Sequence, residues 1–185
     1  STLAVWALSL DSELLFVGDG GTTEPSFPSR RSRVTWTNFY RPVPQLSLDL
    51  DISLAYARFA DVPEGEDRIP GALENVVACG VTWQPPVGER GVFGAARLRH
   101  FGAYPLIEDN SVRATPTTLF NVLGGYQFGL VRLQVSVLNL FDTKAKDIQY
   151  YYDSRLAGEP AAGAGDVHFH PVEPRQLRVA LMWGL

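Results

Sequence analysis

Two histidines near the C-terminal end of the sequence have a spacing that could hold a metal ion. Asp166, His168 and His170 form a D-x-H-x-H pattern. In an extended chain the two imidazoles would share one face, and neutral imidazole is a common ligand of transition metals. Paired histidines beside prolines are also frequent in exposed loops. We therefore predict no metal site here, and we keep His168 and His170 as candidate ligand-facing residues.

Three consecutive tyrosines precede the histidines and offer a second kind of contact. Tyr150, Tyr151 and Tyr152 could stack on a ligand, because a phenol ring combines an apolar face with a polar edge. The same cluster could instead pack a long loop onto the rest of the protein. We keep the three tyrosines as candidate ligand-facing residues and leave both interpretations open.

Four charged side chains fall within segments in which apolar and polar residues alternate. Asp49 and Asp51 lie in one such segment, and Arg97 and Arg99 lie in another. Residues two apart in a strand share a face, so both pairs would lie on the polar face of their strands. We expect them to pair across the interior that the polar faces would enclose, as hydrogen-bonded ion pairs that hold the structure. The alternative role is the attraction of an anionic ligand.

Other kinds of chemistry find no support in the sequence. The three histidines, His100, His168 and His170, belong to no recognisable catalytic motif, and GDGG at 18–21 precedes no helix, so it is not a phosphate loop. Cys79 is the only cysteine, which excludes an internal disulfide and a thiolate metal site. A net charge of -4 provides no basic surface for nucleic acid. The sequence predicts a protein without enzymatic activity or cofactor.

The candidate residues lie among eight segments in which apolar residues alternate with small or polar ones, the pattern of β-strands. The pattern is clearest over Leu46–Phe59, because a helix would scatter its leucines around the circumference. No apolar run reaches the length of about 18 residues that a membrane helix requires. The predicted strands are Thr2–Val17, Arg30–Arg41, Leu46–Phe59, Glu74–Gln84, Gly91–Tyr104, Thr117–Phe128, Val131–Asp142 and Arg175–Leu185.

Connections between the predicted strands alternate between long and short. Every long loop would lie at one end of the sheet, as in outer-membrane barrels. The strands also exceed the roughly 9–11 residues that cross a bilayer. We therefore predict an all-β fold, an antiparallel transmembrane β-barrel; a soluble sandwich or lipocalin-like barrel is the alternative. Aromatic residues near strand ends fit interfacial girdles, namely Tyr40, Tyr56, Trp83, Tyr126, Phe128 and Trp183.

Four segments, in order along the chain, carry recognisable strand-and-loop motifs. They are Ser12–Ser26 (SELLFVGDGGTTEPS), Arg99–Ser111 (RHFGAYPLIEDNS), Val137–Asp142 (VLNLFD) and Tyr150–Pro174. Together they resemble the barrels of TonB-dependent outer-membrane receptors. The resemblance spans nearly the whole chain, so we treat residues 1–185 as one barrel segment. An NLFD-type motif before the last loop and strand is typical of the C-terminal end of these receptors.

The resemblance implies a plugged barrel of about 22 strands in the outer membrane of a Gram-negative bacterium. It also implies uptake of a scarce nutrient such as a metal chelate, with energy relayed by TonB. Only eight strands are predicted, and no segment resembles the plug domain or a TonB box. We therefore expect the C-terminal part of such a barrel, whose partners would include the plug and TonB only through other parts of the chain. The alternative is a self-contained eight-stranded outer-membrane barrel with a structural or binding role.

The final segment looks like the terminal strand that the barrel-assembly machinery recognises. Its apolar face would meet outer-membrane lipid. The signal most often ends in Phe, whereas here the aromatic residue lies two places earlier. This strand must pair with Thr2–Val17 or leave an open edge. The residues of the apolar face are Leu177, Val179, Leu181, Trp183 and Leu185.

Overall fold

The computed structural model describes residues 1–17, 22–86 and 89–184. Strands are the only regular elements in these ranges, so they contain no helix that could cross a membrane. The strands are β1 (Thr2–Leu10), β2 (Leu14–Val17), β3 (Thr22–Pro25), β4 (Ser29–Val43), β5 (Leu46–Phe59), β6 (Asn75–Trp83), β7 (Gly91–Phe101), β8 (Thr117–Phe128), β9 (Val131–Leu138), β10 (Lys146–Ser154), β11 (Ala164–Pro171) and β12 (Gln176–Trp183).

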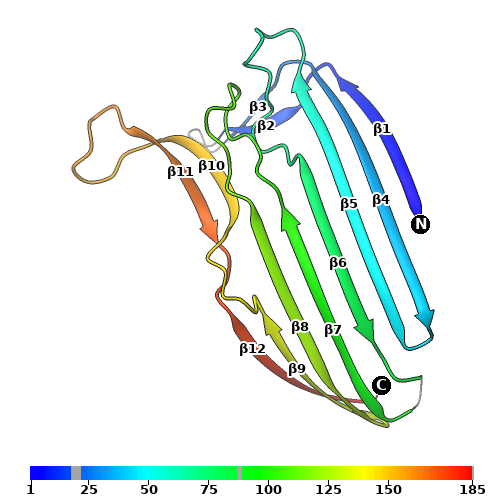
Figure 1. The fold of residues 1–185 in the computed structure, drawn as a ribbon. Helices are drawn as coiled ribbons and strands as arrows, with labels where there is room; N and C mark the ends of the chain where they lie inside the picture. The colour runs from blue at the N-terminus through cyan, green and yellow to red at the C-terminus, as the bar shows by residue number, and fades with distance from the viewer. Residues whose placement is uncertain (18–21, 87–88, 185) are drawn as a thin grey trace.

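Eight of these strands form one antiparallel sheet in the order β1-β4-β5-β6-β7-β8-β9-β12 (Figure 1). If the hairpin strands β2, β3, β10 and β11 are left aside, each strand of this sheet lies beside the strands that come before and after it in the chain. The remaining four form two hairpins, β2–β3 and β10–β11, within the first and last long connections. The all-β antiparallel prediction is confirmed, and β5 and β8 have the predicted bounds.

The connections of the main sheet are tight at one end and long at the other, as predicted (Figure 1). The β4–β5 turn contains only Pro44 and Gln45, and β8 reverses into β9 at Gly129 and Leu130. Gly129 has a φ of 75°, which glycine adopts without steric cost. Because neighbouring strands are antiparallel, the long connections that carry the candidate residues all gather at the opposite end.

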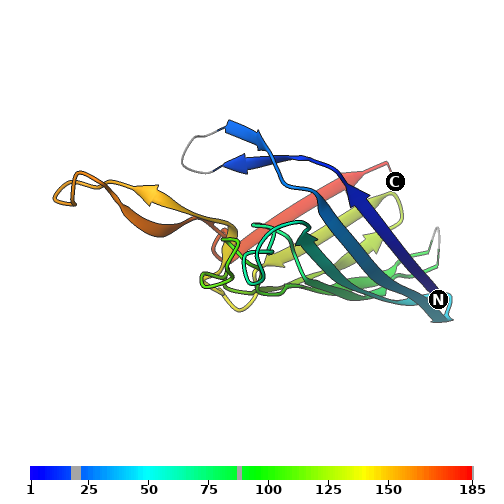
Figure 2. The ribbon, with the colours of Figure 1, turned by 90° about the horizontal axis from the view of Figure 1, so that it is seen from above.

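The main sheet is curved but does not close (Figures 1 and 2). Among the described residues β1 pairs within this sheet only with β4, and β12 pairs only with β9. The sheet therefore has two open edges rather than the seam between first and last strands that a closed eight-stranded barrel would have.

The N-terminal strand is shorter than the predicted Thr2–Val17. Strand β1 ends at Leu10, and β2 leaves the main sheet to pair with β3. Glu13 redirects the chain between them, because its carboxylate accepts hydrogen bonds from the Ser29 hydroxyl and the Arg31 guanidinium. The hydrogen bonds to Glu13 end the pairing of this segment with β4, although apolar residues continue to alternate beyond Glu13.

Strand β1 is apolar on both faces. Leu3 and Val5 oppose Trp36 and Val34 of β4, whereas Trp6, one residue on, opposes Arg33. Opposed residues share a face, so Trp6 lies on the polar face of the sheet.

The long stretch before the last strand was expected to be irregular but contains the β10–β11 hairpin. The three tyrosines of β10 are consecutive, and only Val167 and Phe169 alternate with the histidines of β11, so neither strand has the long apolar alternation used to predict the others. Strand β3 likewise lies within the predicted loop at 18–29, of which residues 18–21 fall outside the described residues. Leu185 of the predicted terminal strand also falls outside them.

Phe93 forms a well-buried contact on the polar face of the main sheet. Its side chain is 2% exposed, and the Arg132 guanidinium carbon lies 3.5 Å from its ring centroid. Gly125 opposes Phe93 on β8, and a Cβ there would lie 2.5 Å from Phe93 Cζ and overlap the carbonyl oxygen of Leu133. The absent side chain of Gly125 therefore makes room for the ring.

We predict that Gly125→Ala destabilises the folded sheet by about 1–3 kcal/mol, because the added methyl group would overlap the Leu133 carbonyl oxygen of β9 and the Phe93 ring. The neighbouring Gly124→Ala is the matched control, since its Cβ would lie 3.6 Å from its nearest neighbour, the Phe93 carbonyl oxygen. Urea titration of the refolded protein measures both free energies of unfolding. Equal values for the two variants would contradict the packing argument.

Candidate functional site

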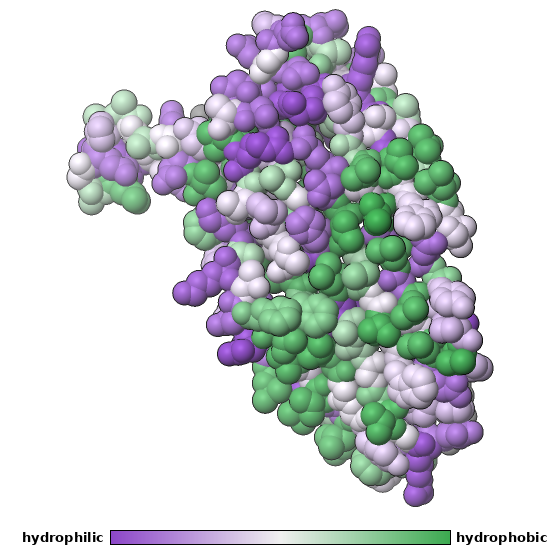
Figure 3. Space-filling model, in the orientation of Figure 1, coloured by the Kyte–Doolittle hydropathy of each residue, from purple (hydrophilic) through white to green (hydrophobic). Residues whose placement is uncertain are grey.

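One face of the main sheet is apolar over its full width (Figure 3). Figure 3 shows hydrophobic residues over the strands and hydrophilic residues gathered over the long connections. A contiguous exposed apolar surface of this kind marks contact with another protein or with lipid. Exposed side chains that the strand registers place on this face are Leu3, Val5, Val34, Leu48, Leu54, Val81, Val92, Leu133, Val135, Leu177, Val179 and Leu181.

Charge is confined to one end of the apolar face. Among the paired residues of β4–β9 and β12, the only arginines on this face are Arg30 and Arg58, which oppose each other near the long connections. Aspartate, glutamate and lysine do not occur there in these paired residues. Aromatic residues lie on the same face near the strand ends, as predicted: Tyr56 toward the long connections, and Tyr40, Trp83, Tyr126, Phe128 and Trp183 toward the tight turns.

The opposite face is polar and carries the charges singled out in the sequence. Asp49 and Arg97 lie on β5 and β7, with Gly80 of β6 between them in the same register row. Arg97 Nη1 donates to Asp49 Oδ2 at 3.0 Å. A Cβ on Gly80 would lie 2.9 Å from Asp49 Oδ1 and 3.0 Å from Arg97 Nη1. The expected hydrogen-bonded ion pair forms, but it spans β6 within one sheet, where Gly80 has no side chain, and does not cross the interior.

Asp51 and Arg99, for which ion pairing was also expected, do not pair with each other. These residues flank Ala78 of β6 as Asp49 and Arg97 flank Gly80, but no carboxylate among the described residues lies within 4.0 Å of the Arg99 guanidinium. Arg99 instead lies over the ring of Phe101, 5.2 Å from its centroid. Ala78 carries a methyl group at the position that corresponds to the Cβ which Gly80 lacks.

The candidate tyrosines and histidines lie on the β10–β11 hairpin, which extends beyond the main sheet (Figures 1 and 2). Tyr150 opposes His168, and Tyr152 stacks on the same imidazole with ring centroids 3.8 Å apart and an interplanar angle of 13°. His170 lies two residues along on the same face. Four of the five candidates are therefore brought together on one face, while Tyr151 lies on the other.

The D-x-H-x-H pattern is extended, although this stretch was expected to be irregular. Asp166, His168 and His170 all lie on one face of β11. Within the described ranges, however, no group of three or more histidine, cysteine or acidic residues is arranged to hold a metal ion. Tyr152 stacks on the face of the His168 imidazole. The hairpin face is better suited to stacking than to coordination.

The base of the hairpin is fixed by a residue that sequence reasoning missed. Gln149 is 3% exposed, and its side-chain amide accepts hydrogen bonds from the Thr115 backbone nitrogen (3.0 Å) and hydroxyl (3.1 Å) and donates to the Thr115 carbonyl (3.0 Å). Burial raises the pKa of the nearby Tyr104 phenol, which keeps it neutral. No local motif signals this contact, because it joins residues 34 positions apart.

The VLNLFD segment at Val137–Asp142 holds together the two ends of the connection that follows β9. Asn139 is 4% exposed and has a φ of 48°. Its side-chain nitrogen donates to the carbonyls of Thr143 and Glu173, both at 3.1 Å, and its backbone nitrogen donates to Asn121 Oδ1 at 2.8 Å. Asn139 therefore joins both ends of the connection that holds the hairpin.

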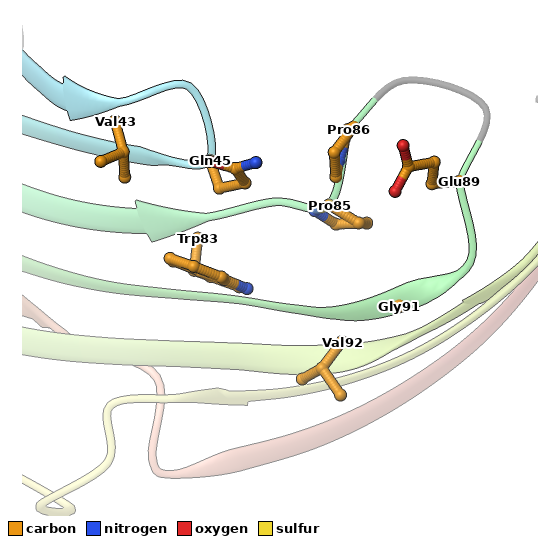
Figure 4. A pocket seen from close by; sticks show the side chains of 8 residues that line it. All are labelled: Val43, Gln45, Trp83, Pro85, Pro86, Glu89, Gly91 and Val92. Carbon is orange, nitrogen blue, oxygen red and sulfur yellow. The ribbon is translucent and has the colours of Figure 1, made fainter.

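A hollow of about 580 Å³ lies at the tight-turn end, between the β4–β5 and β6–β7 connections (Figure 4). Trp83 and Val92 provide apolar walls, and Pro85 and Pro86 lie beside Glu89, its only ionisable lining residue among those described. A single carboxylate without a partner acid, base or nucleophile provides no catalytic arrangement.

We predict that Gly80→Ala abolishes the energetic coupling between Asp49 and Arg97. A double-mutant cycle with Asp49→Asn and Arg97→Gln should give about 0.5–1 kcal/mol in the original background and about zero with Gly80→Ala. The reciprocal control is Ala78→Gly, which should create coupling between Asp51 and Arg99. Unchanged coupling after Gly80→Ala, measured by urea titration, would show that the glycine is not required.

We predict that Asn139→Ala costs about 1–3 kcal/mol, because buried backbone groups lose their partners. Asn139→Gly separates the causes, since glycine accepts the positive φ but lacks the amide. Limited proteolysis of the connection between residues 143 and 173 should accelerate in both variants. If only Asn139→Ala is cleaved faster, the backbone angle at Asn139, rather than its hydrogen bonds, holds this connection in place.

No protein-family model and no curated protein matches the sequence. Solved structures do match. The ferric preacinetobactin receptor BauA of Acinetobacter baumannii is 12% identical with a TM-score of 0.68, and the match covers 99% of this chain and 27% of that one. The ferric-catecholate import receptor Fiu of E. coli K12 is 18% identical with a TM-score of 0.68, covering 99% and 25%. The copper transporter OprC is 16% identical with a TM-score of 0.62, covering 99% and 30%.

The chain thus spans about a quarter to a third of the length of these solved structures. The match extends over nearly every strand described above, so it concerns the whole sheet rather than a local motif. The resemblance inferred from the sequence is confirmed for the fold: the chain has the fold of a segment of a TonB-dependent receptor barrel.

Proposed function

We propose that this chain forms one arc of the outer-membrane barrel of an energised uptake receptor. The observation that carries the proposal is an open antiparallel sheet of eight strands with one continuous, exposed apolar face. A water-soluble sheet buries such a face beneath a second layer. A sheet in an outer membrane exposes it to lipid, with the polar face turned toward the lumen.

The open edges favour an arc of a larger barrel over a self-contained barrel of eight strands. Lipid offers no hydrogen-bond partner to the backbone, so a membrane sheet must close. Strands β1 and β12 pair on one side only among the described residues, and they do not pair with each other. Further strands between β1 and β12 would satisfy both edges and complete a barrel of about 22 strands.

The cargo and the energy source are inferred from likeness to the solved receptors. Two of those named above are ferric receptors, and the third is a copper transporter. We infer uptake of a metal chelate or another scarce nutrient, without enzymatic activity. A plug domain and TonB would act through parts of the protein outside these 185 residues.

Two surfaces of the chain have roles in this proposal. The hairpin face with Tyr150, Tyr152, His168 and His170 lies on the side of the long connections, which is extracellular in outer-membrane barrels, and would contact the ligand. The apolar face of β12 would meet lipid and present the strand to the assembly machinery. Its described residues, Leu177, Val179, Leu181 and Trp183, are 66–81% exposed.

Spin labels on consecutive residues of β6 test the membrane arrangement. The protein is expressed from its complete gene with Cys79→Ser, labelled at Val81→Cys or Thr82→Cys, and placed in lipid vesicles. Val81 lies on the apolar face and Thr82 on the polar face. The Val81 label should collide with lipid-soluble oxygen and be shielded from a water-soluble nickel chelate, and the Thr82 label should show the reverse preference.

The two positions control for each other, because they share one strand and one depth. A Val81 label that meets the nickel chelate as freely as the Thr82 label would overturn the assignment of the apolar face to lipid.

A further inference from the structure

Three arginines lie side by side where the apolar face ends. Arg30 of β4 directly opposes Arg58 of β5, and Arg58 forms an antiparallel β-bridge with Arg68 of the β5–β6 connection. Residues directly opposed in an antiparallel pair have their side chains on the same face. We call Arg30, Arg58 and Arg68 the arginine row.

The arginine row has more positive charge than its acidic neighbours neutralise. Arg58 Nε lies 3.4 Å from Asp67 Oδ2, and Arg68 Nη1 lies 3.1 Å from Glu74 Oε1. Glu74 also binds a further cation from the β7–β8 connection, Arg113, whose Nη2 lies 2.5 Å from Glu74 Oε2. Three guanidinium groups, those of Arg58, Arg68 and Arg113, therefore share two carboxylates.

Arg30 is the uncompensated member of the arginine row. Its side chain is exposed, and no carboxylate among the described residues lies within 4.0 Å of it. Like charges directly opposed across a strand pair are destabilising. The repulsion between Arg30 and Arg58 therefore favours the binding of an anion at this position. Asp67 already neutralises Arg58, so the anion would accept its hydrogen bonds from Arg30.

The position of the row indicates where that anion comes from. The Arg58 guanidinium carbon lies 4.1 Å from the ring centroid of Tyr56, which is 55% exposed on the apolar face. Leu54 follows on the same face and is 56% exposed. Aromatic residues occupy the boundary between hydrocarbon and headgroups in membrane barrels, and arginine extends its charge outward from that depth.

We infer that Arg30, the exposed member of the arginine row, binds the phosphate of an anionic lipid headgroup in the leaflet nearest the long connections. This inference rests on the proposed membrane arrangement and adds a lipid partner to it. A guanidinium group binds phosphate oxygens through two parallel hydrogen bonds. The phosphate of a lipid is attached directly above its acyl chains, so Tyr56 and Leu54 would contact those chains while Arg30 holds the headgroup. Free phosphate would form the hydrogen bonds with Arg30 but not the apolar contacts with Tyr56 and Leu54.

Lipid titration of the protein expressed from its complete gene tests the inference. In detergent micelles, dioctanoyl phosphatidic acid should bind more tightly than dioctanoyl phosphatidylcholine, as measured by native mass spectrometry. Arg30→Gln should weaken phosphatidic acid binding about fivefold, the effect of removing one basic residue near a lipid surface. Arg155→Gln removes the same charge from the exposed β10–β11 connection and should leave binding unchanged.

Four results would overturn the inference. Equal binding of the two lipids by protein whose Val81 and Thr82 labels show the expected accessibilities would overturn it while leaving the membrane arrangement intact. If Arg155→Gln weakens phosphatidic acid binding as much as Arg30→Gln does, the effect comes from the net charge of the protein and not from the arginine row. Competition by inorganic phosphate at the same concentration as the lipid would assign the site to free anions. A Val81 label exposed to water would overturn the membrane arrangement and the lipid site together.

Discussion

Backbone hydrogen bonding between consecutive strands is the constraint on which the rest of this structure depends. Each strand of the main sheet pairs antiparallel with its neighbours along the chain, and side chains alternate between the two faces. A slip of one residue would carry Leu48 and Leu54 to the polar face and Asp49 to the apolar one. A single register therefore creates both the exposed apolar surface and the Asp49–Arg97 pair on the opposite surface.

On the polar face, the smallest side chains decide which contacts form. Gly80 and Ala78 occupy equivalent positions between an aspartate and an arginine, yet only Gly80 allows an ion pair. Gly125 similarly leaves room for the ring of Phe93. The large apolar side chains of this sheet lie on its exposed apolar face and do not fill the polar face. Close contacts on the polar face therefore form where glycine leaves space for a neighbouring side chain.

The sequence predicts most of the sheet because alternation and connection length are local properties. The bounds of β5 and β8 follow from alternation alone. Alternation fails for β1, which is apolar at Val5 and at Trp6 alike, so only its pairing with β4 separates the faces. It also fails for the β10–β11 hairpin, because the tyrosines of β10 are consecutive and β11 has only Val167 and Phe169 alternating with its histidines. The Gln149–Thr115 anchor and the Arg58–Arg68 bridge join connections that only the folded chain brings together.

The long connections of this chain contain a small core of their own. Ile69 and Leu106, from the β5–β6 and β7–β8 connections, are 1% and 5% exposed, and the Gly71 nitrogen donates to the Pro105 carbonyl at 2.9 Å. Arg68 and Arg113 reinforce this contact by sharing Glu74. Burial and ion pairing together restrict the motion of these connections. The hairpin anchored to Thr115 and the arginine row beside Tyr56 are therefore both held by one packed unit, which allows the two surfaces to keep a fixed position relative to the strands.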